Sequence, residues 1–563
     1  MRHSETPENL PRVIGVVAKE AEHPVVREFF ELFKTPWEFY DSNHDYDVVL
    51  CSGGLRVENS AKLILIYGDD PFAQKLERSD SKMALRSFGR EQIPIYGDCF
   101  AINGKGNLLL TFDGIEECGA RECVTGGKWL VRMGYDLFSE VRHLLSEGQP
   151  ASEARIPTLE LHISLLRDLI LRCSISVVEI PPVPAGYTFI ACLTHDVDHP
   201  AIRNHFFDHT MFGFLYRATA GSIVDFFRGR KSLRQIVLNW WAALSLPLVY
   251  FGWAKDPWNQ FARYLEMEKE ASSTFFVIPE KGEPGVGLSS AGPAAKRAAK
   301  YSPQDIADEV RLLQEAGREI GVHGIDAWNN PSAGRREFDR IASLTNNREM
   351  GVRMHWLYSG KDSAQALEQA GFSYDSTCGY NETVGYRAGS LQAFKPLAAN
   401  RLLELPMHIM DTALFYGGYL DYSPKRAHEA VQEMVEHAVR FGGVLTFNWH
   451  DRSIAPERLW DETYVGFLNE LRSRGAWITN AGQTVAWFRK RRRAKIDESA
   501  VEKGEGIKEF GTSADKLPGL RLQIHQNSRC SADVTPIHAE KEACAASAGL
   551  SQLISTDRFM LLA

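Results

Sequence analysis

The stretch Tyr187-Thr188-Phe189-Ile190-Ala191-Cys192-Leu193-Thr194-His195-Asp196-Val197-Asp198-His199-Pro200 decides the fold. An apolar run that ends abruptly in charged residues is typical of a buried strand. Alternate residues of a strand share a face, so Thr194, Asp196 and Asp198 are expected on one face. His195 and His199 are expected on the other. Two carboxylates about 7 Å apart along one face repel each other, so we expect a divalent cation beside them.

The composition is that of an ordinary globular protein, and it argues against a general nucleic-acid-binding protein, a disulfide-rich protein and a secreted protein. The 563 residues suffice for two or three domains. A net charge of -8 and a pI near 6.1 give no general attraction to nucleic acid. The nine cysteines are scattered, without a Cys-x-x-Cys pair, which indicates a reducing compartment. Because the first residues lack an apolar signal core, we expect the protein to lie in the cytoplasm, either free or at the inner face of the membrane.

One apolar stretch stands apart from this composition. Residues 236–253 (IVLNWWAALSLPLVYFGW) carry no charge and follow a group of basic residues: Arg228, Arg230, Lys231 and Arg234. Three interpretations remain open. The stretch forms a buried or half-buried helical hairpin, a Trp-rich helix that lies in a membrane interface, or a membrane span. Its length is at the lower edge for a span, and Asn239 and Pro247 count against that third interpretation.

The pattern along the chain predicts four regions. Residues 1–150 form a small N-terminal α/β domain, with strands at 13–17, 47–51 and 108–112 and a helix at 135–146. Residues 151–186 are a helical connection. Residues 187–489 form the main domain, with an apolar helical insertion at 203–255. Residues 490–563 are polar and poor in aromatics, which predicts a disordered tail. The basic run 489–493 is expected as a solvated helix end, with contact to acidic lipid headgroups or nucleic acid as the alternative.

Strands alternate with helices in the main domain, which indicates a parallel sheet. The predicted strands are 187–194, 273–279, 319–323, 352–357, 372–375, 402–407, 444–450 and 476–479. Seven or eight such units predict a (β/α) barrel of a distorted TIM type. The fold class is therefore α/β, with a smaller N-terminal α/β domain beside the barrel.

Polar residues gather at the ends of these predicted strands. His323 ends the third strand, Arg353 and His355 lie on the fourth, and His450 ends the seventh. Barrel enzymes place their sites at the carboxyl ends of strands, so we expect these side chains to converge on the two aspartates of the first strand.

The order of these pieces resembles the polysaccharide deacetylase (NodB-like, carbohydrate esterase) family, in particular long bacterial members with an extra N-terminal domain. The resemblance covers residues 187 to about 480. Thr194-His195-Asp196-Val197-Asp198 looks like the first motif of the family and Glu319-Ile320-Gly321-Val322-His323-Gly324 like the second. Gly351-Val352-Arg353-Met354-His355-Trp356, Glu404-Leu405-Pro406-Met407 and Leu445-Thr446-Phe447-Asn448-Trp449-His450 are similar to the remaining three.

The resemblance implies a distorted barrel and a metal-dependent hydrolase that removes N-acetyl groups from a sugar. The sugar would belong to a bacterial surface polysaccharide or exopolysaccharide, or to its precursor, including a lipid-linked one. By the same resemblance Asp196 is the general base, Arg353 steadies it, and His450 is the general acid. Asp451 or another acid would raise the pKa of His450.

This sequence departs from the family pattern at two points. The second motif of the family has two histidines four apart, but the later position is Ala327 here, and Val197 separates the two aspartates. Either the metal site is rebuilt from Asp198, His323 and His355, with Asp326 as the alternative third ligand, or the metal has been lost.

Carboxylate and imidazole ligands favour zinc, and cobalt, manganese or nickel also fit them. The expected partner is an N-acetylated glycan or lipid-linked sugar, with no nucleic acid. If 236–253 lies in a membrane interface, a peripheral membrane contact through this stretch is also expected. Two alternatives to the enzyme stay open: a non-catalytic glycan-binding or assembly protein on the same barrel, and a hydrolase of non-sugar amides.

Overall fold

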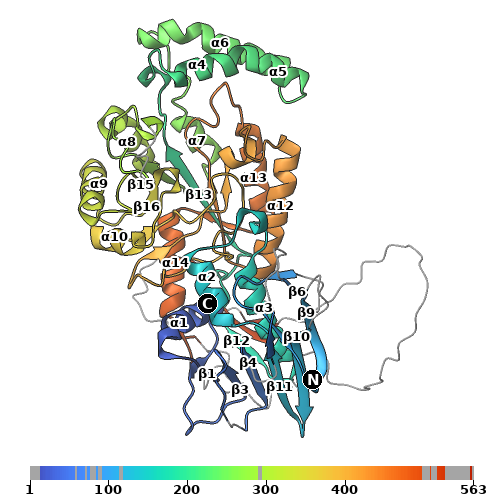
Figure 1. Cartoon of the computed structure of the whole chain (residues 1–563). Coiled ribbons are helices and arrows are strands. Elements are labelled where there is room, and N and C mark those ends of the chain that lie inside the picture. Colours follow the sequence, from blue (N-terminus) through green and yellow to red (C-terminus); the bar gives the residue numbers. More distant parts are fainter. Residues whose placement is uncertain are drawn as a thin grey trace, which may run out of the picture.

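The computed structural model describes residues 13–57, 60–69, 73–76, 84–86, 92–112, 118–288, 295–497, 507–508, 517–526 and 558–560. These residues form three tiers (Figure 1): an N-terminal sheet at the bottom, a second sheet surrounded by helices in the middle, and a layer of helices at the top. The middle tier contains the residues predicted to carry the chemistry.

The bottom tier is a nine-stranded sheet in the order β2-β1-β3-β4-β11-β10-β9-β6-β7. Its strands are β1 (Ile14–Val17), β2 (Trp37–Phe39), β3 (Val48–Cys51), β4 (Leu63–Tyr67), β6 (Ala84–Arg86), β7 (Gln92–Pro94), β9 (Asn107–Phe112), β10 (Cys118–Thr125) and β11 (Lys128–Met133). The first five strands in this order are parallel and the others antiparallel. The three strands predicted in this region are present as β1, β3 and β9.

Three helices supply the other half of the N-terminal core: α1 (His23–Phe33), α2 (Leu137–Ser146) and α3 (Thr158–Arg172). The predicted helix at 135–146 is α2, and Asp136 caps it by accepting a hydrogen bond from the Ser139 backbone N–H at 2.9 Å. The connection 151–186 contains α3, whose apolar face packs into this same core.

The middle tier is a curled parallel sheet in the order β18-β17-β16-β15-β14-β13-β20-β19, with β21 paired to β13. Its strands are β13 (Ile190–Val197), β14 (Thr274–Val277), β15 (Glu319–Gly324), β16 (Val352–Met354), β17 (Tyr374–Asp375), β18 (Leu403–Glu404), β19 (Ile409–Met410), β20 (Val444–Asn448) and β21 (Trp477–Thr479). Each of the eight predicted strands is present, and β19 is an addition.

The protein is therefore a mixed α/β protein whose main sheet is an open barrel. The two edge strands, β18 and β19, are close neighbours in the chain, so the sheet curls back on itself, and no pairing joins these strands in the described part of the chain. The register puts His323 beside Arg353 and Thr194 beside Asn448. Polar groups from four strands, β13, β15, β16 and β20, thus meet at one rim of the sheet.

Helices surround the curled sheet and bury its outer surface. They are α7 (Phe261–Met267), α8 (Ala307–Glu315), α9 (Pro331–Thr345), α10 (Ser363–Ala370), α11 (Asp411–Phe415), α12 (Pro424–Phe441), α13 (Asp461–Ser473) and α14 (Ala481–Arg493). Helix α12 shows why the sequence folds in this way. Its N-cap Ser423 accepts a hydrogen bond from the Arg426 N–H, Pro424 occupies the first helical position, and one apolar face packs into the core.

The top tier follows directly from the carboxyl end of β13. It contains α4 (His209–Tyr216), a π-helical turn (Arg217–Gly221), α5 (Ser222–Phe227) and α6 (Leu233–Tyr250). A small core that includes Phe214, Leu246 and Trp258 holds the tier together. The stretch 236–253 is thus one helix and the turn after it, not a helical hairpin. Among the described residues, we find no helix with both the length and the apolar character required to cross a membrane.

The prediction of a disordered tail is wrong for part of residues 490–563. Helix α14 continues to Arg493, and β24 (Leu522–His525) pairs with β12 (Val177–Glu179) and with β25 (Arg558–Met560). The basic run is a helix end, as predicted, but it is only partly solvated. Arg491 is buried and donates hydrogen bonds to the backbone carbonyls of Ile180 and Leu32. The remaining tail residues lie outside the described ranges.

Candidate metal centre and catalytic pocket

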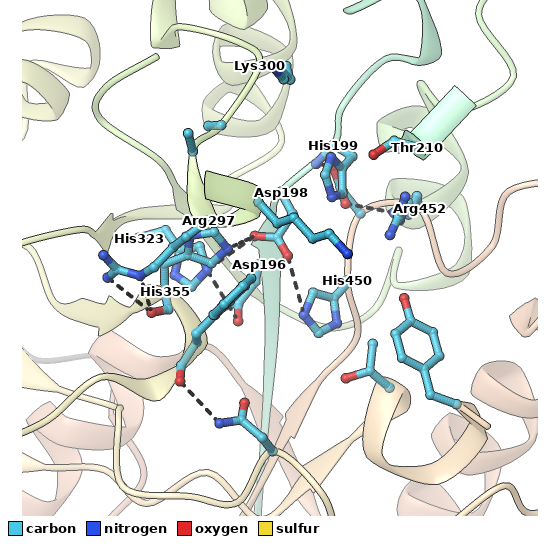
Figure 2. A pocket seen from close by; sticks show the side chains of 18 of the residues that line it. Asp196, Asp198, His199, Thr210, Arg297, Lys300, His323, His355, His450 and Arg452 are labelled. Carbon is cyan, nitrogen blue, oxygen red and sulfur yellow. Dashed lines mark hydrogen bonds and ion pairs between the residues drawn. The ribbon is translucent and has the colours of Figure 1, made fainter. Parts of the chain in front are cut away.

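A cavity of about 850 Å³ opens between the rim of the curled sheet and the top tier (Figure 2). The residues that line it include Asp196, Asp198, His323, His355 and His450. Five of the six predicted site residues therefore border one cavity. The sixth, Arg353, is completely buried directly behind Asp196. His195, on the opposite face of the strand, contacts Glu268 and lies outside this cavity.

Asp198, His323 and His355 form a group that can hold a metal ion, because one ligand atom from each lies within 4.8 Å of the other two. Asp198 Oδ1 is 3.3 Å from His323 Nε2 and 3.6 Å from His355 Nε2. Metal–ligand bonds of 2.0–2.2 Å in a tetrahedral zinc site separate ligand atoms by roughly 3.3–3.6 Å. The spacing of these three side chains therefore fits a small divalent cation.

The hydrogen bond at the far side of His323 supports the same interpretation. Its Nδ1 is 2.9 Å from the backbone carbonyl oxygen of Arg353, so Nδ1 carries a proton and Nε2 presents a lone pair. That lone pair faces the Oδ1 atom of Asp198, which has no hydrogen-bond partner among the described residues. Two acceptors at this distance repel each other unless a cation lies between them, and either a metal ion or a proton meets this need.

The electrostatics of the group agree with a cation site. Burial lowers the pKa of His355 to about 3, more than the Asp198 carboxylate raises it, so this imidazole is neutral at pH 7. Burial also lowers the pKa of His323, but Asp196 and Asp198 outweigh it and raise that pKa. In the metal-free protein a proton on His323 therefore competes for the position that a metal would take.

Asp196 is held ionised and in a fixed orientation. Its Oδ1 accepts a hydrogen bond from Arg353 Nη1 at 3.1 Å, and its Oδ2 accepts one from Asn448 Nδ2 at 2.7 Å. Burial alone would raise the pKa of Asp196, but the positive charges of His323 and Arg353 lower it. Arg353 is in turn fixed by Ser376, which accepts from Nε through its carbonyl and from Nη2 through its hydroxyl.

His450 lies across the cavity from His355 (Figure 2), and its partner is an acid that the sequence did not single out. Its Nδ1 is 2.6 Å from Asp411 Oδ1, and Asp411 Oδ2 accepts the His450 backbone N–H at 2.6 Å. Burial would lower the pKa of His450, but Asp411, with Asp198 and Asp196, raises it to about 10.

Of the two alternatives expected for the acid beside the His450 ring, Asp451 or another acid, the structure has the second, Asp411. The Asp451 carboxylate instead accepts the backbone N–H groups of His199 and Arg452, both at 2.9 Å. Asp451 thus shapes the wall beside His450, while Asp411 contacts the ring itself.

One further expectation can be placed in the structure, and two residues of the site were not predicted. Asp326, the alternative third ligand, accepts the Val286 N–H at 2.7 Å and is not part of the group of possible ligands. Asn448 and Asp411 were both missed. Asn448 belongs to a predicted strand, so its alternation with Thr446 could have indicated a polar residue at the rim. Asp411 follows β19, a strand of two residues that is too short to leave a recognisable pattern.

No family model matches the chain, and no curated protein matches it in a search by sequence. Several solved structures resemble it in fold. A probable polysaccharide deacetylase from Pseudomonas aeruginosa PAO1 is 13% identical, with a TM-score of 0.34, over 55% of this chain and 94% of that one. Puue allantoinase is also 13% identical, with a TM-score of 0.34, over 55% of this chain and 92% of that one.

A third solved structure aligns with nearly the whole chain. Agd3, described as a novel carbohydrate deacetylase, is 8% identical, with a TM-score of 0.32, over 92% of this chain and 91% of that one. Identities and TM-scores this low do not transfer an activity from these proteins to this chain, so its function must be argued from its own residues.

Proposed function

We propose that this protein is a metal-dependent hydrolase that removes N-acetyl groups from a sugar of a bacterial surface polysaccharide or exopolysaccharide, or from its precursor. The observation that carries the proposal is the grouping of Asp198, His323 and His355 in a cavity that also holds Asp196 and His450. A pure binding protein needs neither a carboxylate held ionised by a buried arginine nor an imidazole backed by a second carboxylate.

The three grouped side chains would hold a divalent cation through one carboxylate and two imidazoles, which favours zinc and also suits cobalt, manganese or nickel. When bound, such a cation supplies Lewis acidity and lowers the pKa of a coordinated water toward about 7. A protein that supplies only three ligands leaves a position free for that water and for the carbonyl oxygen of the substrate.

Asp196 is the general base in this proposal. It accepts a proton from the attacking water, and the contacts with Arg353 and Asn448 keep its carboxylate ionised and aimed into the cavity. Asp196 and Arg353 form a buried ion pair, so removing either side chain would leave the other as an unpaired buried charge.

His450 is the general acid. Amide hydrolysis requires a proton on the departing nitrogen, and a protonated His450 can deliver it from Nε2, which lies 3.8 Å from Asp198 Oδ2 beside the cation site. Asp411 holds the opposite ring nitrogen and favours the protonated form. Asp196 and His450 border the same cavity as the three possible metal ligands, so base and acid can act on one bound amide.

An N-acetylated sugar is the substrate that the five sequence motifs favour, and the outer face of the top tier supports a substrate presented at a membrane. Its exposed side chains include large apolar residues of α5, α6 and the turn after α6: Ile223, Phe227, Leu233, Val237, Leu238, Trp240, Trp241, Leu244, Leu248, Phe251 and Trp253. We refer to this set as the apolar face. A surface this apolar and rich in tryptophan is typical of a peripheral membrane contact.

Acetate release from a panel of N-acetylhexosamine glycans and glycosides tests the proposed function. The purified full chain is assayed with zinc, cobalt, manganese or nickel, beside Asp196→Asn and His323→Ala. Wild type should release acetate with at least one metal, and each variant should lose at least 99% of that activity while remaining folded. Equal acetate release from wild type and both variants would contradict the proposal, as would release from non-sugar amides alone.

A further inference from the structure

Three arginines form a cluster in the wall of the cavity beside His450. Arg217 comes from the π-helical turn of the top tier, and Arg452 and Arg458 come from the segment that follows β20. All three line the cavity that holds the candidate metal site. Figure 2 shows Arg452 on the side of His450 that faces away from His355. We refer to Arg217, Arg452 and Arg458 as the arginine cluster.

The cluster has hydrogen-bond donors without acceptors. The Nε atoms of Arg217 and Arg458 and the Nη1 atom of Arg452 are buried, and none has a partner among the described residues. Only 6% of Arg458 is exposed. A buried N–H group without an acceptor destabilises the folded protein, and more so when the group is charged. The three residues line one cavity, and a ligand with several acceptor oxygens at this wall would satisfy such donors after a small side-chain adjustment.

Aromatic rings rather than carboxylates hold two of these guanidinium groups in place. Arg452 lies over the Trp258 ring at 5.0 Å, and Arg458 lies over the Tyr416 ring at 5.0 Å. Arg458 also donates hydrogen bonds from Nη1 to the Ser453 hydroxyl and from Nη2 to the Tyr416 hydroxyl, so its Nε is the group left without an acceptor. Stacking fixes the plane of the Arg452 guanidinium group and leaves its Nη1 without an acceptor. The cluster is thus organised before any ligand binds.

The positive charge of the cluster is only partly neutralised. Three acids lie near it. Glu457 accepts a hydrogen bond from Trp258 Nε1 at 3.2 Å, Asp411 is paired with His450, and burial raises the pKa of Asp451 to about 7, which weakens its negative charge at neutral pH. Burial and the nearby Arg458 lower the pKa of Arg217 to about 10, which still leaves it protonated at pH 7. Burial would raise the pKa of Tyr416, but Arg458 and Arg452 lower it instead. The field at this wall therefore favours a negative charge.

A second cavity adjoins the first at this wall. It has a volume of about 890 Å³, and Arg217, Tyr416 and Arg458 line both cavities. The second cavity extends along α5 and the start of α6, where Val224 and Arg228 border it. A ligand with its sugar in the first cavity and a further group in the second would place the connecting atoms against the arginine cluster.

We propose that the substrate is a phosphate ester of the N-acetylated sugar, a glycosyl phosphate or diphosphate whose phosphoryl oxygens are bound by Arg217, Arg452 and Arg458. This inference rests on the proposed function and adds the chemical class of the substrate. A phosphoryl group offers several acceptor oxygens and a charge near -2, which matches three guanidinium groups better than a carboxylate does. The remainder of the ester is either a nucleoside or a lipid, which the second cavity would accept.

Kinetics with paired substrates test the inference in the metal-loaded full chain. The pair is N-acetylglucosamine 1-phosphate and the methyl glycoside of the same sugar, and the readout is the ratio of their kcat/KM values for acetate release. Wild type should prefer the phosphate by at least tenfold. In Arg217→Gln and in Arg452→Gln this ratio should fall at least fivefold, chiefly through the KM of the phosphate. A matched control is Arg263→Gln, an exposed arginine of α7 outside the cavity, which should keep the wild-type ratio.

Binding of inorganic phosphate separates this inference from the proposed function. Calorimetry on His323→Ala, which lacks a candidate metal ligand, should still detect phosphate binding, and adding Arg452→Gln to that variant should weaken it at least tenfold. Arginine-dependent phosphate binding without acetate release from any sugar would retain the anion site and reject the deacetylase. Acetate release with equal kcat/KM for both substrates, or an adventitious ion only in calorimetry, would overturn the inference and retain the deacetylase.

Two larger esters identify the source of the phosphate. One is a nucleoside diphosphate sugar, and the other is the same sugar on a short prenyl diphosphate in detergent micelles. A lower KM for the prenyl ester than for the nucleotide ester assigns the second cavity to a lipid, and the reverse order assigns it to a nucleotide. If both are poorer substrates than the neutral methyl glycoside, the phosphate inference is wrong.

Discussion

The Nδ1 atom of His450 lies 2.6 Å from Oδ1 of Asp411, a residue 39 positions earlier in the chain. Asp411 is completely buried, and its other oxygen accepts hydrogen bonds from the His450 backbone N–H and from the Ser453 hydroxyl. One carboxylate therefore fixes the ring, the backbone and the following turn together. This arrangement favours the protonated form of His450, the proposed general acid, and fixes the orientation of its ring.

The pairing predicts the behaviour of Asp411→Asn. Without the negative charge, the pKa of His450 in the metal-free protein should fall from about 10, and kcat for acetate release should fall by roughly 10²–10⁴. Histidine NMR on the metal-free protein measures the first effect and steady-state kinetics the second. Asp451→Asn is the matched control and should cost less than tenfold, since Asp451 accepts backbone N–H groups rather than the ring. Equal losses in the two variants would argue against the assignment of Asp411.

Metal content separates the possible third ligands. His323→Ala and His355→Ala should each reduce bound zinc by at least tenfold at a fixed free-metal concentration, because each removes one of three ligands. Asp326→Asn should bind zinc as wild type does, since Asp326 accepts the Val286 N–H and lies outside the group. Elemental analysis after dialysis measures all three proteins. Zinc loss in Asp326→Asn with retention in His355→Ala would reverse the ligand assignment.

Charges placed on the apolar face should weaken membrane binding. Trp241 and Leu244 of α6 are 73% and 74% exposed. Because moving such side chains out of an apolar environment costs about 1.5–3 kcal/mol each, Trp241→Glu with Leu244→Glu should lower partition onto anionic phospholipid vesicles at least tenfold. Leu312→Glu, an exposed leucine of α8, is the control and should leave partition unchanged. Vesicle flotation provides the measurement, and equal flotation of all three proteins would exclude this face as the contact.

Acid should loosen the attachment of the C-terminal strand β24. Burial would raise the pKa of Glu179, but Arg167 and His525 lower it to about 2, below its ordinary value of 4.5. A carboxyl group whose pKa is lower in the folded state stabilises that state above its unfolded pKa, and this contribution disappears as the pH falls through 4.5 toward 2. The contribution at neutral pH is on the order of 3 kcal/mol.

Glu179→Gln tests this linkage. Denaturant unfolding should show wild type more stable than the variant at pH 7, with the difference shrinking between about pH 5 and 2. His525→Ala should reproduce part of the loss, because it removes one of the two groups that lower the pKa of Glu179. A constant difference between wild type and Glu179→Gln across this pH range would show that the pair does not contribute.

Local patterns in the sequence were enough to predict the strands of the curled sheet and the faces of β13. Asp196 and Asp198 point toward the cavity and His195 points away, because side-chain alternation is a property of any strand. The gathering of His323, His355 and His450 at one rim also followed from the sequence, since parallel strands bring their carboxyl ends to the same edge. The roles of these residues remain predictions, as do the predicted domain boundaries.

Only the tertiary structure decided which groups contact one another across the chain. Asp411 pairs with His450, Asn448 binds Asp196 from 252 positions away, and Arg491 is buried against backbone carbonyls. The arginine cluster likewise joins a turn of the top tier to the segment after β20. Such pairs depend on strand register and on how tiers pack. These are set by many weak contacts summed over the whole core, and no short stretch of sequence encodes them.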